Sequence, residues 1–182
     1  NNAYLMSENE ILKKTLNIEN EKKFMQDFSI IAKVILDQES PFLKSILINK
    51  GTKNKVRKGM AVFSKDYLIG SIIETNYLSS RVLLLTDLNS KLPIIIEGTD
   101  VNAILEGTGS KQDLYLNYLP TDYKIEVNKI IFTSGKGGFF TPGIPVAKSY
   151  LSKNNKILIK LLADPNQALI INVTNGQIKM IN

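Results

Sequence analysis

The chain has 182 residues, of which 43% are hydrophobic and 22% are charged, and its formal net charge is +6. These proportions lie close to globular averages, which argues against a disordered tail and against a membrane-embedded chain. The absence of His, Cys and Trp excludes Ser/His/Asp and Cys/His nucleophilic systems, zinc sites built on thiolate or imidazole, and iron–sulfur ligation. We therefore expect no catalytic activity, no cofactor and no bound metal, although a carboxylate-dependent hydrolase remains open on composition.

Residues 1–28 carry an apolar repeat with a period of seven. Tyr4, Ile11, Ile18 and Met25 are each seven positions apart, charges of both signs fill other positions, and no Gly or Pro interrupts the segment. Such a repeat is typical of a helix that buries one narrow seam in a coiled coil. We predict a helical stalk that pairs two copies in parallel; the alternative is a helix packed on its own domain. The predicted dimer seam consists of Tyr4, Leu5, Ile11, Leu12, Ile18 and Met25.

From Ser29 onward the apolar pattern changes from helical to strand-like. Short runs rich in β-branched residues follow one another at spacings of about 8 to 12 residues, separated by turn residues, which is typical of a barrel or sandwich. A dozen strands are more than one small barrel needs, so we predict a mainly β protein with two small β-barrel subdomains. The predicted strands are Ile30–Leu36, Ser45–Asn49, Met60–Ser64, Leu68–Glu74, Arg81–Thr86, Pro93–Glu97, Ala103–Leu105, Leu114–Leu119, Lys129–Thr133, Ile144–Tyr150, Lys156–Leu162 and Ala168–Val173.

Two stretches rich in turn residues, 51–58 and 106–113, mark the weakest points of this β region. Neither is a long flexible linker. We therefore expect one β-subdomain to be inserted between two parts of the other. The predicted domains are the helical stalk over 1–28, a discontinuous first β-subdomain over 29–54 and 109–182, and an inserted second β-subdomain over 55–108.

A glycine-rich turn follows the strand that we predict to end at Thr133. Glycines and a lysine after a strand can cradle a phosphate. The phosphate-loop motif is incomplete, however, because the lysine is not followed by Ser or Thr and because Pro142 opposes a following helix. We predict a structural turn in which glycines adopt positive φ angles. Its residues are Gly135, Gly137, Gly138, Pro142 and Gly143.

A basic turn over 50–58 concentrates much of the positive charge, with Lys50, Lys53, Lys55, Arg57 and Lys58. The phosphates of a nucleic acid or of a membrane surface are candidate ligands. The turn lacks interleaved aromatic residues for base stacking, so we expect no nucleic-acid partner, and a solvated lysine-rich loop is the alternative.

The carboxylates are scattered along the chain and show no metal-ligand spacing. Asp87 ends a predicted strand. An acidic residue in this position most often bonds backbone amides in the following turn, and we expect that role for Asp87.

Several blocks of sequence lie on predicted strands or turns, namely Ile48–Gly51 with Val56–Val62 and Leu68–Gly70, Ser80–Asp87 with Asn89-Ser90, and Thr133–Gly138 with Pro142–Val146. In this order they resemble the family of the rod shape-determining protein MreC. Lys55 stands where that family commonly has a turn Gly, and Tyr67 replaces a Gly before Leu68-Ile69-Gly70. We expect Asn54 or Asp66 to adopt the positive φ angle instead. Upstream, Glu8-Asn9-Glu10 and Leu12 resemble the register of the family's helix.

The resemblance implies a protein of the bacterial inner membrane. This chain begins at Asn1 and has no run of about 18 apolar residues, so we expect a fragment whose transmembrane helix lies upstream. The resemblance further implies a coiled-coil helix and two small β-barrels outside the cytoplasm, in the periplasm, with a chymotrypsin-like strand topology and no protease activity. Members of the family scaffold the elongation machinery for lateral peptidoglycan synthesis, linking MreB filaments and MreD to a penicillin-binding transpeptidase and its glycosyltransferase partner.

We therefore expect a structural scaffold that controls cell shape. It would form a homodimer, and with further self-association filaments, and it would reach MreB and MreD through the missing N-terminal region. Its β-subdomains would offer strand edges and an apolar groove to neighbouring copies and to the transpeptidase. The alternatives are a carboxylate-dependent β-barrel hydrolase and an anion- or nucleic-acid-binding β-barrel.

Replacing both Ile11 and Ile18 by Lys is expected to abolish dimerisation without changing thermal unfolding of the barrels, because like charges would face each other across the seam. Each seam side chain contributes about 1.5 to 3 kcal/mol on full burial, and the cost of association offsets part of this, so the dimer should be weak. Sedimentation measures the dimer and calorimetry the barrels. A chain that is monomeric at all accessible concentrations, or a double variant with unfolded barrels, contradicts the coiled coil.

Overall fold

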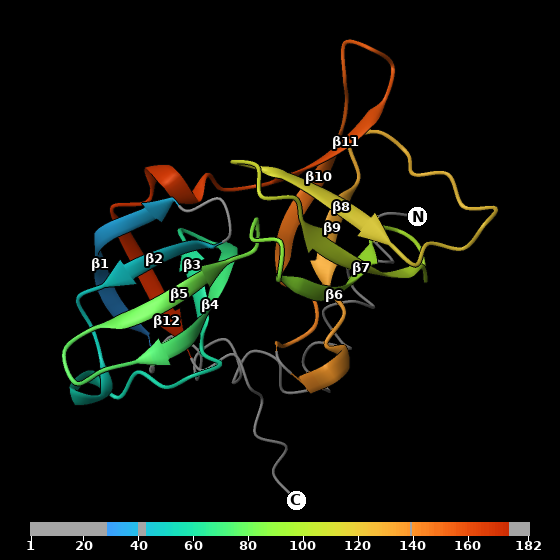
Figure 1. Cartoon of the computed structure of the whole chain (residues 1–182). Helices are drawn as coiled ribbons and strands as arrows, with labels where there is room; N and C mark the ends of the chain where they lie inside the picture. Colours follow the sequence, from blue (N-terminus) through green and yellow to red (C-terminus); the bar gives the residue numbers. More distant parts are fainter. Residues whose placement is uncertain (1–28, 40–42, 139, 175–182) are drawn as a thin grey trace, which may run out of the picture.

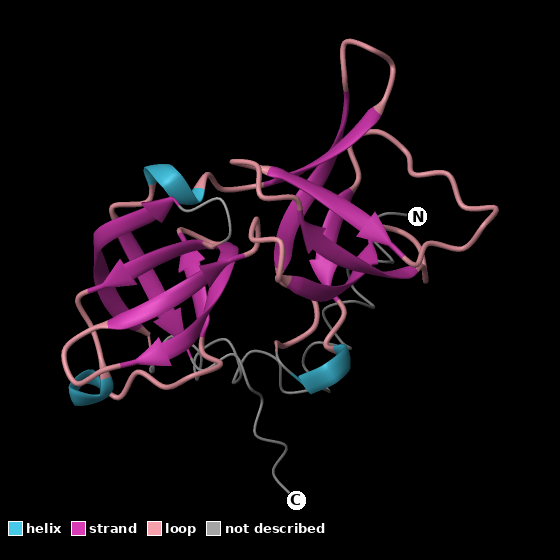
Figure 2. Cartoon of the chain, in the orientation of Figure 1, coloured by secondary structure: helices cyan, strands magenta, loops and turns pink. Residues whose placement is uncertain are grey.

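The computed structural model describes residues 29–39, 43–138 and 140–174, and the predicted stalk over 1–28 lies outside these residues. The described chain contains twelve β-strands and three short 3-10 helices (Figure 2). Each predicted strand overlaps one observed strand, which confirms the mainly β prediction. The strands form two barrels that lie side by side (Figure 1).

The first barrel takes its six antiparallel strands from both ends of the described chain. They are β1 (Ile30–Glu39), β2 (Lys44–Ile48), β3 (Ala61–Ser64), β4 (Tyr67–Thr75), β5 (Ser80–Leu84) and β12 (Ile170–Thr174). Their closed order is β1-β12-β3-β4-β5-β2. The last strand closes the barrel, because β12 pairs with β1 on one side and with β3 on the other.

The second barrel is formed by six strands that are consecutive in the sequence. They are β6 (Lys91–Ile96), β7 (Asn102–Gly107), β8 (Asp113–Asn117), β9 (Ile130–Thr133), β10 (Pro145–Leu151) and β11 (Ile157–Leu161). Their closed order is β6-β7-β8-β11-β10-β9. Read from β12, the closed order of the first barrel is β12-β1-β2-β5-β4-β3, which is the same pattern if β12 is counted as its first strand. This is the chymotrypsin-like strand order that the family resemblance implied.

The strand pairing places the domain boundaries elsewhere than we predicted. Segment 55–108 is not a unit, because β3, β4 and β5 belong to the first barrel whereas β6 and β7 belong to the second. The chain crosses between the barrels at 85–90 and 162–169, and neither segment contains Gly or a long polar linker. Turn composition misled the prediction, since 51–58 and 106–113 are loops within one barrel each, and local composition does not reveal which strands pair.

Apolar side chains alternate along the strands and fill the interior of both barrels. In β6, for example, Leu92, Ile94 and Ile96 are buried while the residues between them are not, as the period of two of a strand requires. Ala61 and Leu68 come from the first barrel but pack in the apolar cluster that fills the second. The two barrels are therefore joined by direct apolar packing.

Two lysines adopt the left-handed conformation that L-residues rarely take, Lys55 with φ 65° and Lys65 with φ 55°. Our expectation that Asn54 or Asp66 would do so was wrong. Asn54 is the last residue of the short helix η1 (Thr52–Asn54), and Lys55 caps it with its N–H bonded to the carbonyl oxygen of Thr52 at 2.9 Å. The end of the helical turn, not the residue type, determines which position is left-handed.

The glycine-rich turn connects β9 to β10 through the short helix η2 (Lys136–Gly138). Gly135, Gly137, Gly138 and Gly143 have φ angles of 74°, 80°, 68° and 86°. A Cβ atom on Gly135 would lie 2.9 Å from Cδ of Pro142, whereas one on Gly138 would meet nothing within 4 Å. A side chain at position 135 is therefore disfavoured both by the positive φ angle and by the contact with Pro142. A side chain at position 138 is disfavoured by the positive φ angle alone.

Gly135→Asn should destabilise the protein more than Gly138→Asn. Asn tolerates positive φ angles better than other non-Gly residues, so we expect the Gly138 variant to lose less than about 1 kcal/mol of unfolding free energy. At Gly135 the added side chain must also displace Pro142, and we expect a loss of about 1 to 3 kcal/mol. Urea unfolding of both variants tests this, and equal losses would show that Pro142 imposes no constraint.

Candidate protein-interaction surfaces

Asp87 is a buried carboxylate whose oxygens are occupied by neighbouring N–H groups. Its Oδ2 accepts a hydrogen bond from the backbone N–H of Lys44 at 2.6 Å. Its Oδ1 accepts from the backbone and side-chain amides of Asn89 at 2.8 and 2.9 Å, and the first of these is the turn interaction that the sequence predicted. Asp87 thus ties the start of β2 to the segment that crosses to the second barrel, and this is a structural role.

Over 29–39, 43–138 and 140–174, no group of three or more potential metal ligands lies close enough to hold an ion. The same residues contain no helix of the length and apolar character that a bilayer crossing requires. The surface does carry three features that can bind other molecules, namely a groove, a projecting hairpin and a basic loop.

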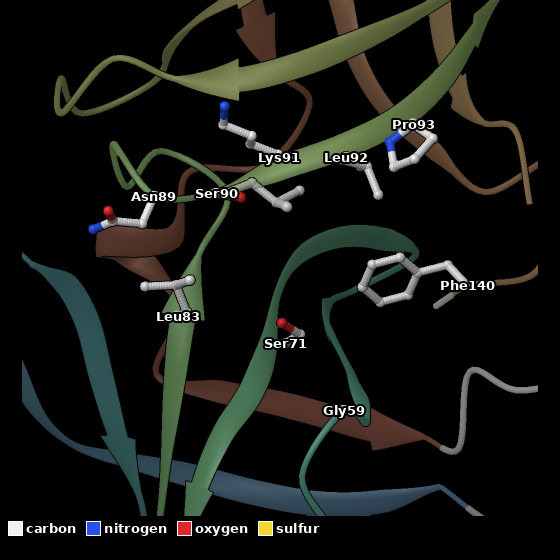
Figure 3. Close-up of a pocket in the computed structure, with 10 residues that line it drawn as sticks. Gly59, Ser71, Leu83, Asn89, Ser90, Lys91, Leu92, Pro93 and Phe140 are labelled. Atoms are coloured by element: carbon white, nitrogen blue, oxygen red, sulfur yellow. The ribbon is translucent and has the colours of Figure 1, made fainter. Parts of the chain in front are cut away.

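The groove lies between the two barrels and has a volume of about 200 Å³ (Figure 3). The first barrel contributes Ser71 and Leu83, the second contributes Leu92 and Pro93, and the ring of Phe140 points into the groove from the glycine-rich turn. Pockets for small-molecule ligands usually measure about 300 to 1,000 Å³. This mainly apolar groove therefore suits one or two side chains of a partner protein better than a separate ligand.

The strand edges that we expected are absent from the barrel walls. Both sheets are closed, so each strand of the described chain has a neighbour on either side. Closure removes the unpaired N–H and C=O groups to which a further strand could bond. The expectation of pairing through exposed edges was therefore wrong for the walls, and only strand ends that extend beyond them offer free backbone.

One such extension is the hairpin of β10 and β11, which we call the arm (residues 150–158). β9 pairs with β10 at Lys148 and not beyond, and β8 pairs with β11 from Ile159 onward, so the two strands of the arm pair only with each other. The arm projects from the second barrel (Figure 1). A two-stranded hairpin is marginally stable in water without further packing.

The arm is apolar on both faces. Tyr150 pairs with Leu158 and Leu151 pairs with Ile157, and all four side chains are between 37% and 55% exposed. Because the side chains of a strand alternate between faces, one pair lies on each face of the arm. Nζ of Lys148 lies 5.8 Å from the ring centroid of Tyr150. Such exposed apolar surface usually marks a site of protein–protein contact.

Sequence reasoning predicted the strands of the arm but missed its exposure. The available signal was the break in alternation at its end. Tyr150-Leu151 and Ile157-Leu158 are adjacent apolar pairs on either side of a polar turn, whereas a strand with one buried face alternates apolar and polar residues.

The basic turn is exposed and lies against the hairpin tip between β4 and β5. The N–H groups of Thr52 and Lys53 donate to the carbonyl oxygens of Asn76 and Tyr77 at 2.9 and 3.1 Å. The side chains of Lys53, Lys55, Arg57 and Lys58 are exposed, and Lys50 is half-buried. We call residues 50–58 and 76–79 together the basic end.

Two closed barrels with the same strand order, the second inserted between strands of the first in the sequence, define a double β-barrel protein. The chain belongs to the MreC family, because the family model "Rod shape-determining protein MreC, barrel core" matches residues 34–175. This is a family of cell shape-determining structural proteins and not of enzymes, in agreement with our prediction.

Individual relatives extend this similarity. The cell shape-determining protein MreC of Escherichia coli K12 is 36% identical over 118 residues, which are 65% of this chain and 32% of the relative. The structure of MreC from Pseudomonas aeruginosa is 26% identical with a TM-score of 0.72, covering 80% of this chain and 97% of that one. MreC from Listeria monocytogenes has the same identity and TM-score over 97% and 91% of the two chains. This chain thus spans about a third of the length of the E. coli relative.

Asp87→Ala is expected to lower the free energy of unfolding by about 1 to 3 kcal/mol, because partly buried N–H donors of Lys44 and Asn89 lose a charged acceptor. Asp113→Ala is the matched control. Its carboxylate is 51% exposed and lies 4.0 Å from Nζ of Lys160, so we expect a loss below about 1 kcal/mol. Urea unfolding measures both free energies of unfolding, and an equally small loss in the two variants would contradict the structural role of Asp87.

Proposed function

We propose that this chain is the barrel core of a cell-shape scaffold that couples cytoskeletal filaments to the enzymes of lateral peptidoglycan synthesis. The match of residues 34–175 to the MreC barrel core carries this proposal, because it covers nearly all described residues. The fold supports it too, since closed barrels are rigid platforms for surfaces that bind other proteins.

The cellular setting that we propose also follows from family membership. The protein is held in the inner membrane by a transmembrane helix upstream of this chain, and its barrels lie outside the cytoplasm. It reaches MreB and MreD through the region before residue 1 and pairs with a second copy through the stalk. A related structure is described as the major periplasmic domain of MreC, and its fold matches this chain with a TM-score of 0.66.

The direct partner that we propose is a penicillin-binding transpeptidase. A chain of the complex between PBP2 and MreC from Helicobacter pylori matches this chain with a TM-score of 0.59 at 14% identity. At this identity the likeness extends to the fold alone. The residues that would bind the transpeptidase must therefore be found on the surface of this chain.

The arm is the contact that we propose for the transpeptidase. It presents Tyr150 and Leu158 on one face and Leu151 and Ile157 on the other, so a partner that encloses it buries apolar surface on both sides. Tyr is enriched among the residues that dominate binding energy in protein interfaces. The groove beside Phe140 is a second apolar contact, and its small volume limits it to one or two side chains.

Tyr150→Ser combined with Leu158→Ser should weaken binding of the purified extracytoplasmic part of the transpeptidase by about tenfold or more, since each lost anchor costs about 1 kcal/mol or more. The matched control is Ile31→Ser with Ile170→Ser. Both isoleucines are 65% exposed on the wall of the first barrel, and their loss should leave binding unchanged.

Biolayer interferometry gives the affinities, and melting temperatures establish that both double variants are folded. Failure of the unmodified chain to bind contradicts the transpeptidase as a direct partner. Binding that the arm variant leaves unchanged contradicts the arm as the contact.

A further inference from the structure

The basic end combines positive charge with exposed apolar side chains on one rim of the first barrel. The loop after β2 and the hairpin tip between β4 and β5 lie together at this rim (Figure 1). β1 begins at the same rim, because the N–H of Lys33 donates to Oδ1 of Asn49 at 2.8 Å. The described chain therefore begins at the rim that carries the basic end.

The five cations of the basic end form no ion pair with a described carboxylate. The ion pairs of the described chain are Arg81–Glu74, Lys91–Glu106, Lys129–Glu126 and Lys160–Asp113. The carboxylate of Glu74, near the same rim, is thus engaged by Arg81 at 3.3 Å. This rim offers five positive charges to an outside partner.

The geometry of the basic end is held by backbone contacts. A Cβ atom on Gly51 would lie 2.2 Å from the carbonyl oxygen of Asn76, so only Gly lets the loop approach the hairpin this closely. The hydroxyl of Ser80 donates to the carbonyl oxygen of Lys50 at 2.7 Å, and Val56 is buried beneath the loop. The backbone that carries the cations is therefore held next to the hairpin tip in the absence of a partner.

The hairpin tip itself is apolar. Tyr77 and Leu78 are 66% and 61% exposed, and Nζ of Lys53 lies 6.0 Å from the ring centroid of Tyr77. Tyr side chains favour the headgroup level of a bilayer, and lysines can extend their apolar stems while the charge remains among the headgroups. Cations near an anionic lipid surface each strengthen binding by about fivefold.

We infer that the basic end binds the surface of a bilayer that contains anionic phospholipids. The cations contact the headgroup phosphates, and Tyr77 and Leu78 enter the boundary between headgroups and acyl chains.

An anionic bilayer explains both the charge and the apolar tip of the basic end. A nucleic acid would account for the charge, but its bases stack on successive aromatic side chains and the basic end offers the ring of Tyr77 alone. An acidic protein surface would account for the charge but would not require the apolar tip. This inference does not depend on the proposed transpeptidase partner.

The absence of Trp from the chain permits a direct test with the full 182-residue chain. Tyr77→Trp should show a blue-shifted fluorescence on phosphatidylcholine vesicles with about one third phosphatidylglycerol, and no shift on phosphatidylcholine alone. The control is Tyr118→Trp, at a tyrosine of the second barrel that is 73% exposed, and this reporter should not shift. A shift of both reporters, or of neither, overturns the proposal.

Charge reversal provides an independent second measurement. Lys53→Glu, Lys55→Glu and Lys58→Glu together should lower partitioning onto the anionic vesicles by about 100-fold or more. The control reverses the same number of exposed lysines at Lys124, Lys153 and Lys156 and should retain most of the binding. An equal fall in both variants indicates attraction by net charge alone and overturns the proposal. Binding of polyglutamate or DNA without binding of vesicles overturns it in favour of a soluble polyanion.

Discussion

The pairing of β12 with β1 and β3 is the contact on which the rest of the structure depends. Strands β1 to β5 alone would form a sheet with two unpaired edges, and β12 fills the gap between them. Because β12 follows the second barrel in the sequence, closing the first barrel holds the second barrel at both of its ends. Ala61 and Leu68 add apolar packing between the barrels, and Asp87 bonds the first crossing segment to β2.

Closure also determines where this protein can bind others. The walls of closed barrels have no free backbone for strand addition, so binding must use side chains in loops, in overhanging strands and between the barrels. The arm belongs to the second barrel, the basic end belongs to the first, and the groove lies between the two. Because these surfaces are formed by different residues, occupation of one leaves the others free, which the proposed scaffold role requires.

All twelve strands were predictable from the sequence because a half-buried strand has a local signal, the period of two seen at Leu92, Ile94 and Ile96. The domain boundaries were not, because pairing between Ile30 and Val173 joins residues from opposite ends of the chain and leaves no local trace. The left-handed Lys55 depends on where a helical turn ends, and the exposure of Tyr150 depends on how far its neighbouring strands extend. Both are properties of the assembled fold rather than of residue type.

Because β12 closes the first barrel, its position in the sequence also determines the order in which the two barrels can complete their folding. A chain is synthesised from its N-terminus, so β1 to β5 are made before the second barrel. They cannot close into a barrel until β12 has been made, and β12 follows the second barrel in the sequence. The second barrel, whose strands are contiguous, can be completed first. During this interval the edges of β1 and β3 are open to incorrect pairing with other chains. The first barrel to begin folding is therefore the last to finish, and any truncation that removes residues 170–174 leaves it open permanently.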